Sequence, residues 1–276
     1  MLLKLILLFF IIINTSTNNY NDIENVFIGE FNTFDPYELG ENGIKDNIPD
    51  LSTDRIFLWI KNDSCIMTKN HKLLSKFKGK IEDDKDYEIY QLSEYKISSE
   101  ITLVENQDIY FLYNGNKYNT KIEKTFCYKG WVYGYFASCF IPDELKEKDS
   151  NENFFPLIGS TNQEIQIFLD RYHSGQVDGE VFSYKDYKIE SSIRDTGERG
   201  YFDAIVYDAS LIVKYKDKEI YRFNSTTKLD YMVGDFNGNG KLDIYIQECF
   251  WGRLYLLVEF DKEKIYEKTY QQHSAC

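Results

Sequence analysis

The chain has 276 residues, carries a formal net charge of −13 and is 43% hydrophobic and 17% aromatic. It therefore has enough apolar side chains to build one or two packed domains. The negative charge argues against a nucleic-acid partner, because basic side chains are needed to neutralise a phosphate backbone. An acidic chain can hold cations, although most of these carboxylates are expected only to maintain solubility.

The N-terminus combines one basic residue, Lys4, with an uncharged apolar run over residues 5–13. This pattern is typical of a secretory signal, and the run is shorter than the about 20 apolar residues that a membrane-spanning helix needs. We therefore predict a signal peptide over residues 1–18 and a secreted or periplasmic protein. A membrane is expected as a partner only if this segment stays uncleaved, and no Ala-x-Ala pattern marks the cleavage site.

Alternation of apolar and polar side chains dominates the rest of the chain and predicts β-strands. Tyrosine and phenylalanine supply most of the aromatic side chains, as a half-buried pleated surface favours. An N-terminal segment over residues 19–51 precedes the first predicted strand. The predicted strands cover residues 56–60, 87–92, 109–113, 118–122, 131–138, 165–169, 179–189, 202–208, 211–215, 220–223, 231–234, 242–246 and 254–260.

Two of these runs are joined by Asn114 and Gly115. An Asn-Gly pair between alternating runs predicts a β-hairpin, because both residues tolerate positive φ. No long helical period occurs, and only residues 70–77 and 142–148 are compatible with short helices.

A charged stretch that is nearly free of core residues separates two β-rich units. It covers residues 142–156 and has the composition of a linker. We therefore predict one β domain over residues 52–141 and a second over residues 157–276.

The first domain contains a recognisable aromatic segment, Tyr-Lys-Gly-Trp-Val-Tyr-Gly-Tyr-Phe, at residues 128–136. This segment resembles the closing strands of bacterial SH3-like domains. The resemblance implies a small five-stranded barrel that binds peptides or cell-wall stems through exposed aromatic rings, here Trp131, Tyr133 and Tyr135. The alternative is that alternate members of the segment form the barrel core, and for Trp131 this alternative is preferred.

The chain has five cysteines, and export would permit disulfides. Because five is an odd number, at least one cysteine is either a free thiol or paired with another chain. Cys127 and Cys139 flank a predicted hairpin and are the favoured pair, although spacing does not fix connectivity. No Cys-x-x-Cys occurs, so neither a zinc ribbon nor a thioredoxin-like site is indicated.

Residues 234–244 read Gly-Asp-Phe-Asn-Gly-Asn-Gly-Lys-Leu-Asp-Ile. In a calcium loop of the EF-hand type, oxygen ligands come from positions one, three, five, seven and nine, and position six is glycine. Counted from the first aspartate, the sixth place is Gly240, where the sharp turn needs positive φ. The predicted ligands of a Ca²⁺ ion are therefore Asp235, Asn237, Asn239, the carbonyl of Lys241, and Asp243.

The loop departs from the EF-hand in two respects. The twelfth place is Ile246 rather than a bidentate glutamate, so no EF-hand helix pair is expected. With only two carboxylates, binding should fall in the extracellular range of about 10⁻⁴ to 10⁻³ M. The alternative is an Asn-Gly-Asn-Gly turn that holds no metal.

Together with its flanking strands and the later Gly-Arg-Leu-Tyr at residues 252–255, the loop resembles one FG-GAP or VCBS-type repeat. In those families such a loop holds calcium between strands of a propeller blade. A propeller needs at least about four blades, and the chain has no comparable array. The loop is therefore expected to belong to a compact β sheet or sandwich. An incomplete copy of the same spacing occurs at residues 170–178, where Tyr172 occupies the third ligand position.

Catalytic motifs are lacking. The three histidines, His71, His173 and His273, lie outside any His-Glu-x-x-His motif, and no Gly-x-Ser-x-Gly elbow occurs. We therefore predict an exported, non-enzymatic binding protein that recognises a peptide, cell-wall or protein ligand and carries a structural calcium site. The alternative is a cell-wall or glycan hydrolase that uses a pair of carboxylates in a cleft.

Overall fold

The computed structural model describes residues 26–31, 55–61, 71–78, 86–92, 94–96, 102–129, 133–145, 157–172, 174–200, 203–249 and 253–272. These residues form strands β1 to β19 and one 3₁₀ helix, η1 (Asp143–Leu145). The prediction of a mainly β fold is confirmed. The described part of the chain contains no helix that is long and apolar enough to cross a membrane. The predicted signal peptide lies outside the described residues.

The first unit is a β-barrel, in which the pairing of β8 with β9 closes a ring of six strands. Strands β3 and β4 continue the sheet from β8 outside the ring, and a separate two-stranded ribbon pairs β5 (Glu94–Lys96) with β6 (Thr102–Val104). The strand order of the barrel sheet is β3 (His71–Lys78), β4 (Asp86–Leu92), β8 (Asn116–Lys129), β7 (Asp108–Tyr113), β10 (Leu157–Ser160), β1 (Val26–Phe31), β2 (Arg55–Lys61) and β9 (Tyr133–Phe140).

The hairpin predicted at Asn114 and Gly115 is confirmed. Strands β7 and β8 pair from Tyr113 opposite Asn116 onward, and the two turn residues have φ values of 48° and 71°. Positive φ at both central residues is the conformation that matches the twist of a two-residue hairpin.

Two barrel strands come from segments outside the predicted barrel domain. Strand β1 belongs to the predicted N-terminal segment and β10 to the start of the predicted second domain, and they pair with each other inside the barrel sheet. Both are short, and residues 26–29 of β1 and all of β10 are buried on both faces, so they lack the alternation that identifies a half-exposed strand. A Cβ on Gly29 would lie 2.5 Å from Leu58 Cδ2 and 3.0 Å from the carbonyl oxygen of Phe57, so only glycine allows this close approach. With these two strands the ring has six members, β1, β2, β7, β8, β9 and β10, instead of the five that were predicted.

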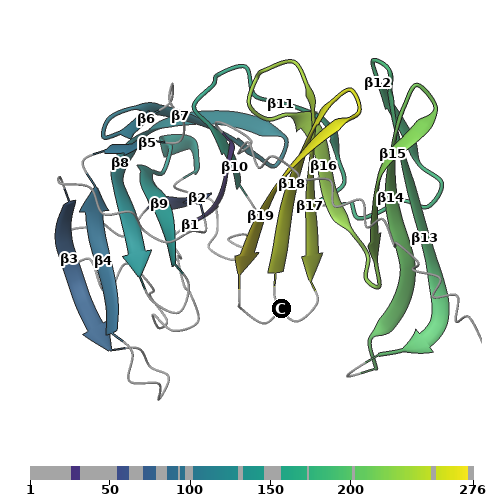
Figure 1. Cartoon of the computed structure of the whole chain (residues 1–276), viewed down its shortest axis with the longest axis horizontal. Coiled ribbons are helices and arrows are strands. Elements are labelled where there is room, and N and C mark those ends of the chain that lie inside the picture. Colours follow the sequence, from purple (N-terminus) through teal and green to yellow (C-terminus); the bar gives the residue numbers. More distant parts are fainter. Residues whose placement is uncertain are drawn as a thin grey trace, which may run out of the picture.

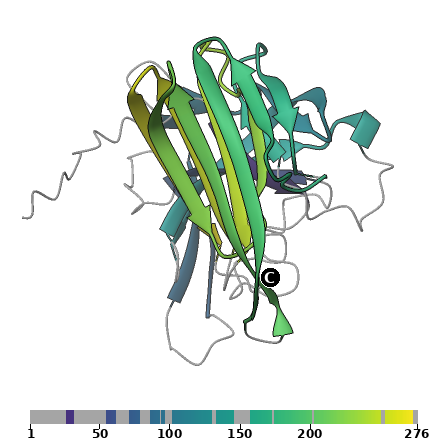
Figure 2. The same ribbon diagram turned by 90° about the vertical axis from the view of Figure 1, so that its right-hand side faces the viewer.

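The second unit consists of two antiparallel sheets. The middle sheet has the order β11 (Gln166–Asp170), β16 (Asp230–Asp235), β17 (Leu242–Cys249), β18 (Arg253–Asp261) and β19 (Lys264–Gln272). The outer sheet has the order β12 (Val181–Tyr184), β13 (Tyr187–Arg199), β14 (Ile205–Tyr215) and β15 (Lys218–Ser225). Figure 1 shows the barrel, the middle sheet and the outer sheet side by side, and Figure 2 shows the long strands of the outer sheet lying over the middle sheet.

The central strands of the middle sheet, β16 to β18, are buried on both faces because the sheet lies between the other two layers. On β17, Tyr245 packs into a cluster shared with the outside of the barrel, whereas Ile244 and Ile246 pack into a cluster shared with the outer sheet. Successive side chains of a strand point to opposite faces, so one strand contributes to both cores. A third cluster, which includes Phe111 and Leu58, fills the barrel interior.

Several predicted elements differ from the structure. Residues 71–78 form a strand rather than a short helix, and residues 142–148 contain only η1. The predicted strand over residues 179–189 is a hairpin that turns at Lys185, whose φ of 51° places it in the left-handed region. The predicted strands at 202–208 and 211–215 are one strand, β14.

The predicted disulfide between Cys127 and Cys139 is wrong, because Cys139 is a free, buried thiol. The two cysteines lie on neighbouring strands but out of register, with Cys127 opposite Tyr135 and Cys139 opposite Ile122. Burial raises the pKa of the Cys139 thiol far above its ordinary value, so this side chain behaves as a small apolar residue.

Candidate metal centre

The predicted calcium loop connects β16 to β17 at one end of the middle sheet. Its anchor is Phe236, which is fully buried in the cluster between the middle sheet and the barrel. Gly234 allows the loop to begin, because a Cβ there would collide with the carbonyl oxygen of Gln166 on β11 and with the Phe236 ring. The loop is therefore held at its start by packing against both the neighbouring strand and the barrel.

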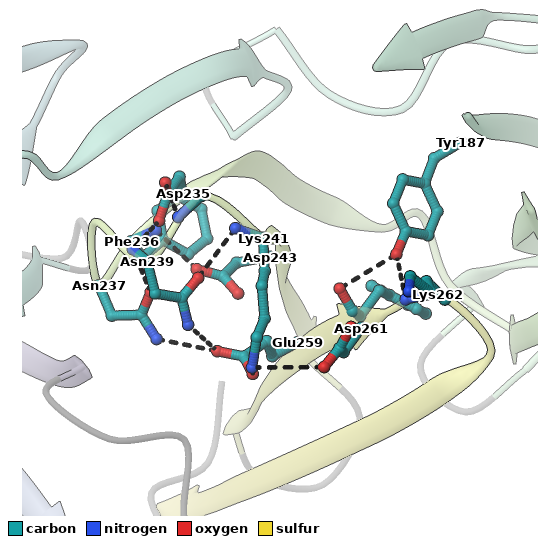
Figure 3. Close-up of polar contacts among 12 residues, drawn as sticks. Tyr187, Asp235, Phe236, Asn237, Asn239, Lys241, Asp243, Glu259, Asp261 and Lys262 are labelled. Atoms are coloured by element: carbon teal, nitrogen blue, oxygen red, sulfur yellow. Dashed lines mark hydrogen bonds and ion pairs between the residues drawn. The ribbon is translucent and has the colours of Figure 1, made fainter. Parts of the chain in front are cut away.

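Side-chain oxygens and backbone amides of the loop hold it in a tight curl (Figure 3). The two carboxylate oxygens of Asp235 accept the N–H groups of Asn239 (3.0 Å) and Gly240 (2.7 Å). The amide oxygen of Asn237 also accepts the Asn239 N–H (3.2 Å), and that of Asn239 accepts the Lys241 N–H (2.9 Å). Gly240 has a φ of 78°, as predicted for the sharp turn. The loop thus turns its oxygen-bearing side chains inward.

Asp243 is the buried carboxylate beside this curl. Its Oδ2 accepts the Phe236 N–H at 2.6 Å, whereas its Oδ1 is buried and has no hydrogen-bond partner. Burial raises the pKa of the Asp243 carboxyl well above its usual range, and the nearby charges of Glu259 and Asp235 raise it further against the opposing Phe236 hydrogen bond. A buried carboxylate oxygen without a partner carries a desolvation cost that a cation would offset.

Glu259 is a third carboxylate at the site, and it lies outside the spacing that predicts the ligands. It lies on β18 directly opposite Asp243 and is only 5% exposed. Its Oε2 accepts the side-chain N–H groups of Asn237 (2.9 Å) and Asn239 (2.7 Å). Its position in the sequence does carry one indication of this role. By the alternation of β18, Glu259 lies on the same buried, barrel-facing side of the strand as Leu257. A glutamate at an apolar position of a buried strand needs polar partners.

Lys241 supplies the positive charge at the site. Its ammonium lies 2.6 Å from Glu259 Oε1, 4.0 Å from Asp261 Oδ2 and 5.4 Å from the centre of the Tyr266 ring. Burial works against the charged form, but the hydrogen bond to Glu259 holds the pKa of the Lys241 ammonium above its ordinary value. The ammonium is thus a fixed positive charge beside Glu259, and its charge also acts on Asp243.

The donor set fits calcium better than it fits a transition metal. Among the described residues, no three His, Cys, Asp or Glu side chains form a metal-holding group by themselves. The loop instead offers carboxylate, amide and backbone oxygens, which are the hard ligands that calcium accepts. The structure brings together the side chains of all four predicted side-chain ligands, Asp235, Asn237, Asn239 and Asp243. The unpartnered Asp243 oxygen is the observation that points to a cation.

The outer sheet also contacts the loop. Lys185, at the turn between β12 and β13, donates from its ammonium to the carbonyl oxygen of Gly240 at 2.6 Å. The same ammonium lies 4.8 Å from the centre of the Tyr184 ring, which stacks on Phe168 of β11. The loop is therefore fixed from the outer sheet as well as from the barrel.

The aromatic side chains predicted to bind a ligand do not form a described surface. Tyr135 is 4% exposed and packs inside the barrel. Tyr133 begins β9, but its side chain lies outside the described residues, as does the whole of Trp131. The two carboxylates of the incomplete motif at residues 170–178 have separate hydrogen-bond partners, since Asp170 accepts from the Tyr172 N–H and Asp178 accepts from the Ile193 N–H.

No protein-family model, curated protein or solved structure matches the chain. The resemblances to an FG-GAP or VCBS-type repeat and to an SH3-like domain therefore stay predictions from local motifs.

Proposed function

We propose that the protein is an exported, non-enzymatic binding protein whose second β unit is stabilised by one calcium ion in the loop from Asp235 to Asp243. The observation that carries the proposal is the buried Oδ1 of Asp243, which has no partner and lies beside a curled loop of oxygen-bearing side chains. Ordered proteins rarely leave such an atom unpaired without a structural or functional reason.

The residues that would hold the ion are those predicted from the spacing: the side chains of Asp235, Asn237, Asn239 and Asp243, and the Lys241 carbonyl. Calcium would supply positive charge to two carboxylates that the chain itself leaves incompletely balanced. Because the loop joins β16 to β17 and Phe236 packs against the barrel, ordering the loop would stabilise the middle sheet and its contact with the barrel.

The expected affinity is modest, with a dissociation constant of about 10⁻⁴ to 10⁻³ M, because only two of the predicted ligands are carboxylates. Binding of that strength suits a secreted or periplasmic protein that meets abundant calcium. The basic residue and apolar run at the N-terminus support export. A peptide, cell-wall or protein ligand for the barrel is part of the same proposal, and it would be sought by pull-down with variants of Trp131 and Tyr133.

Isothermal titration of the calcium-free protein with calcium chloride tests the site. We expect one ion per chain and loss of the binding heat in Asp235→Asn and in Asp243→Asn. Magnesium chloride should give no comparable heat, since Mg²⁺ demands near-ideal octahedral geometry and gives up its water reluctantly. Equal binding of calcium by the wild type and by both variants would contradict the assignment.

A further inference from the structure

Glu259 and Lys241 form an ion pair at the edge of the loop that the predicted ligand pattern does not use. The ammonium and the carboxylate oxygen are 2.6 Å apart, and their side chains are 34% and 7% exposed. The pair is thus largely shielded from solvent, where charges interact more strongly than at an open surface. Figure 3 shows the Lys241 side chain running from the loop to Glu259, next to the two asparagines.

Glu259 determines which way the two asparagine amides face. Its Oε2 accepts the NH₂ groups of both Asn237 and Asn239, so their carbonyl oxygens point the other way, into the curl of the loop. An asparagine turned by half a rotation would present hydrogen-bond donors to a cation instead of an oxygen. The glutamate therefore selects the amide orientation that a cation requires.

Lys241 acts on the same loop in the opposite sense. Its ammonium is paired with Glu259 and its charge acts on Asp243, so it offsets part of the negative charge that would attract a divalent cation. It also holds Glu259 in place without occupying Asp243 Oδ1, which keeps no partner. The ion pair thus combines a carboxylate that orients the two amides with an ammonium that repels the calcium ion.

We propose that the Glu259–Lys241 ion pair sets the calcium affinity of the loop: Glu259 orients the two amide ligands, and the Lys241 ammonium weakens binding by repulsion. The inference rests on the proposed calcium site and adds a positioning residue and an affinity control to it. Its signature is that neutralising the two partners moves the affinity in opposite directions.

The test compares Glu259→Gln with Lys241→Met by calcium titration and by the luminescence of terbium(III), a probe for oxygen-lined calcium sites. Glutamine has one acceptor oxygen in place of two, so it cannot accept from both asparagine NH₂ groups and from the Lys241 ammonium at once, and its hold on the amide orientation weakens. We expect calcium binding about 10- to 100-fold weaker, the usual cost of losing an outer-shell partner. Removal of the ammonium should make calcium binding about tenfold tighter, because a charge repelling the divalent ion is lost.

The ion pair between Lys218 and Glu263 is the matched control. It also joins an ammonium to a carboxylate, at 2.7 Å, but its side chains are 65% and 57% exposed and it lies apart from the loop contacts. Glu263→Gln and Lys218→Met change the net charge by the same amounts and should leave calcium affinity unchanged. Melting each variant in EGTA shows that it is folded. If Glu259→Gln does not fold, Lys241→Met still tests the repulsion, because unchanged or weaker calcium binding in that variant would overturn the proposal.

Opposite shifts of the two variants with a silent control pair support the proposal. Weaker binding in both variants, or no change in either, overturns it and reduces the pair to a structural contact. If the wild type binds neither calcium nor terbium(III), the proposed calcium site itself fails, which is a different result from a binding wild type with unshifted variants.

Discussion

Two carboxylate clusters lie near the two ends of the same strand, β16, and they are balanced in different ways. Near its start, the Glu180 carboxylate forms an ion pair with the Arg171 guanidinium and accepts a hydrogen bond from the Tyr231 hydroxyl at 2.8 Å. At its end, Asp243 keeps one buried oxygen without a partner. The Arg171 hydrogen bonds lower the pKa of Glu180, whereas burial raises that of Asp243. The first cluster is complete within the chain, and the second calls for a cation from outside.

The largest expected effect comes from breaking the complete cluster. Arg171→Met leaves the Glu180 carboxylate without its counter-ion, and Glu180 is 16% exposed at its side chain. We expect the free energy of unfolding in urea to fall by about 2 to 3 kcal/mol, by the same amount in calcium and in EGTA.

A matched control is Arg194→Met, which removes an ion pair whose side chains are 75% and 66% exposed and which should cost about 0.5 kcal/mol or less. A loss at Arg171 that calcium restored would contradict the independence of the two clusters.

The next effect in size comes from the incomplete cluster. With calcium at about 10 mM and the expected affinity, the ion should add about 1.4 to 2.7 kcal/mol to the free energy of unfolding. Asp243→Asn should lose this gain while remaining at least as stable as the wild type in EGTA, because a buried charge is removed.

Denaturation with and without calcium measures both quantities. The control Asp217→Asn, at a side chain that is 86% exposed, should keep the full calcium gain. A calcium gain that survived in Asp243→Asn would show that this carboxylate is not a ligand.

Acid should affect the two clusters in opposite directions. The folded-state pKa of Glu180 is below its ordinary value of 4.5, so its contribution to stability is complete above that pH and is lost as the pH falls through the folded pKa. The pKa of Asp243 is raised above 3.8, so without calcium its cost appears as the pH rises from that value toward the folded pKa.

Near neutral pH the wild type should be more stable than Glu180→Gln, and this advantage should shrink in acid. In EGTA at the same pH, Asp243→Asn should be more stable than the wild type, and that advantage should also shrink in acid. Urea denaturation between about pH 3 and pH 7 gives both curves. Two curves of the same sign would contradict the assignment of opposite pKa shifts.

The smallest effect should come from the contact between the outer sheet and the loop. Lys185→Met removes the hydrogen bond to the Gly240 carbonyl, a contact worth about 0.5 kcal/mol or less because it is exposed to solvent. The loop keeps its predicted ligands, so calcium should still bind. Calorimetry should show the same calcium stoichiometry as the wild type, with Lys188→Met as a control at a neighbouring exposed ion pair. Loss of calcium binding would mean that Lys185 does more than hold the loop.

The local patterns predicted the fold class and most strands, since half-exposed strands alternate and Asn114-Gly115 is a strong hairpin signal. They did not predict that β1 and β10 complete the barrel. That pairing joins segments far apart in sequence, and both strands are buried on two faces, so no local period marks them. They also missed β19, which carries several charged and polar side chains along an edge of the middle sheet.

The candidate site was predictable only as far as one continuous loop extends. Spacing alone identified the ligand places from Asp235 to Asp243. Glu259 comes from another strand and reaches the loop through the β17–β18 register, which no local spacing encodes. Its place at an apolar position of a buried strand was the one signal, and it indicates a polar partner without naming it.

Thermal unfolding of the wild type in EGTA and in about 10 mM calcium chloride tests the calcium site most directly. A stabilisation of about 1.4 to 2.7 kcal/mol should raise the melting temperature by roughly 3 to 10 °C, and the rise should be absent with magnesium and in Asp243→Asn. An unchanged melting temperature at 10 mM calcium would contradict the account, because the buried Asp243 oxygen would then have to be tolerated by the fold without a cation.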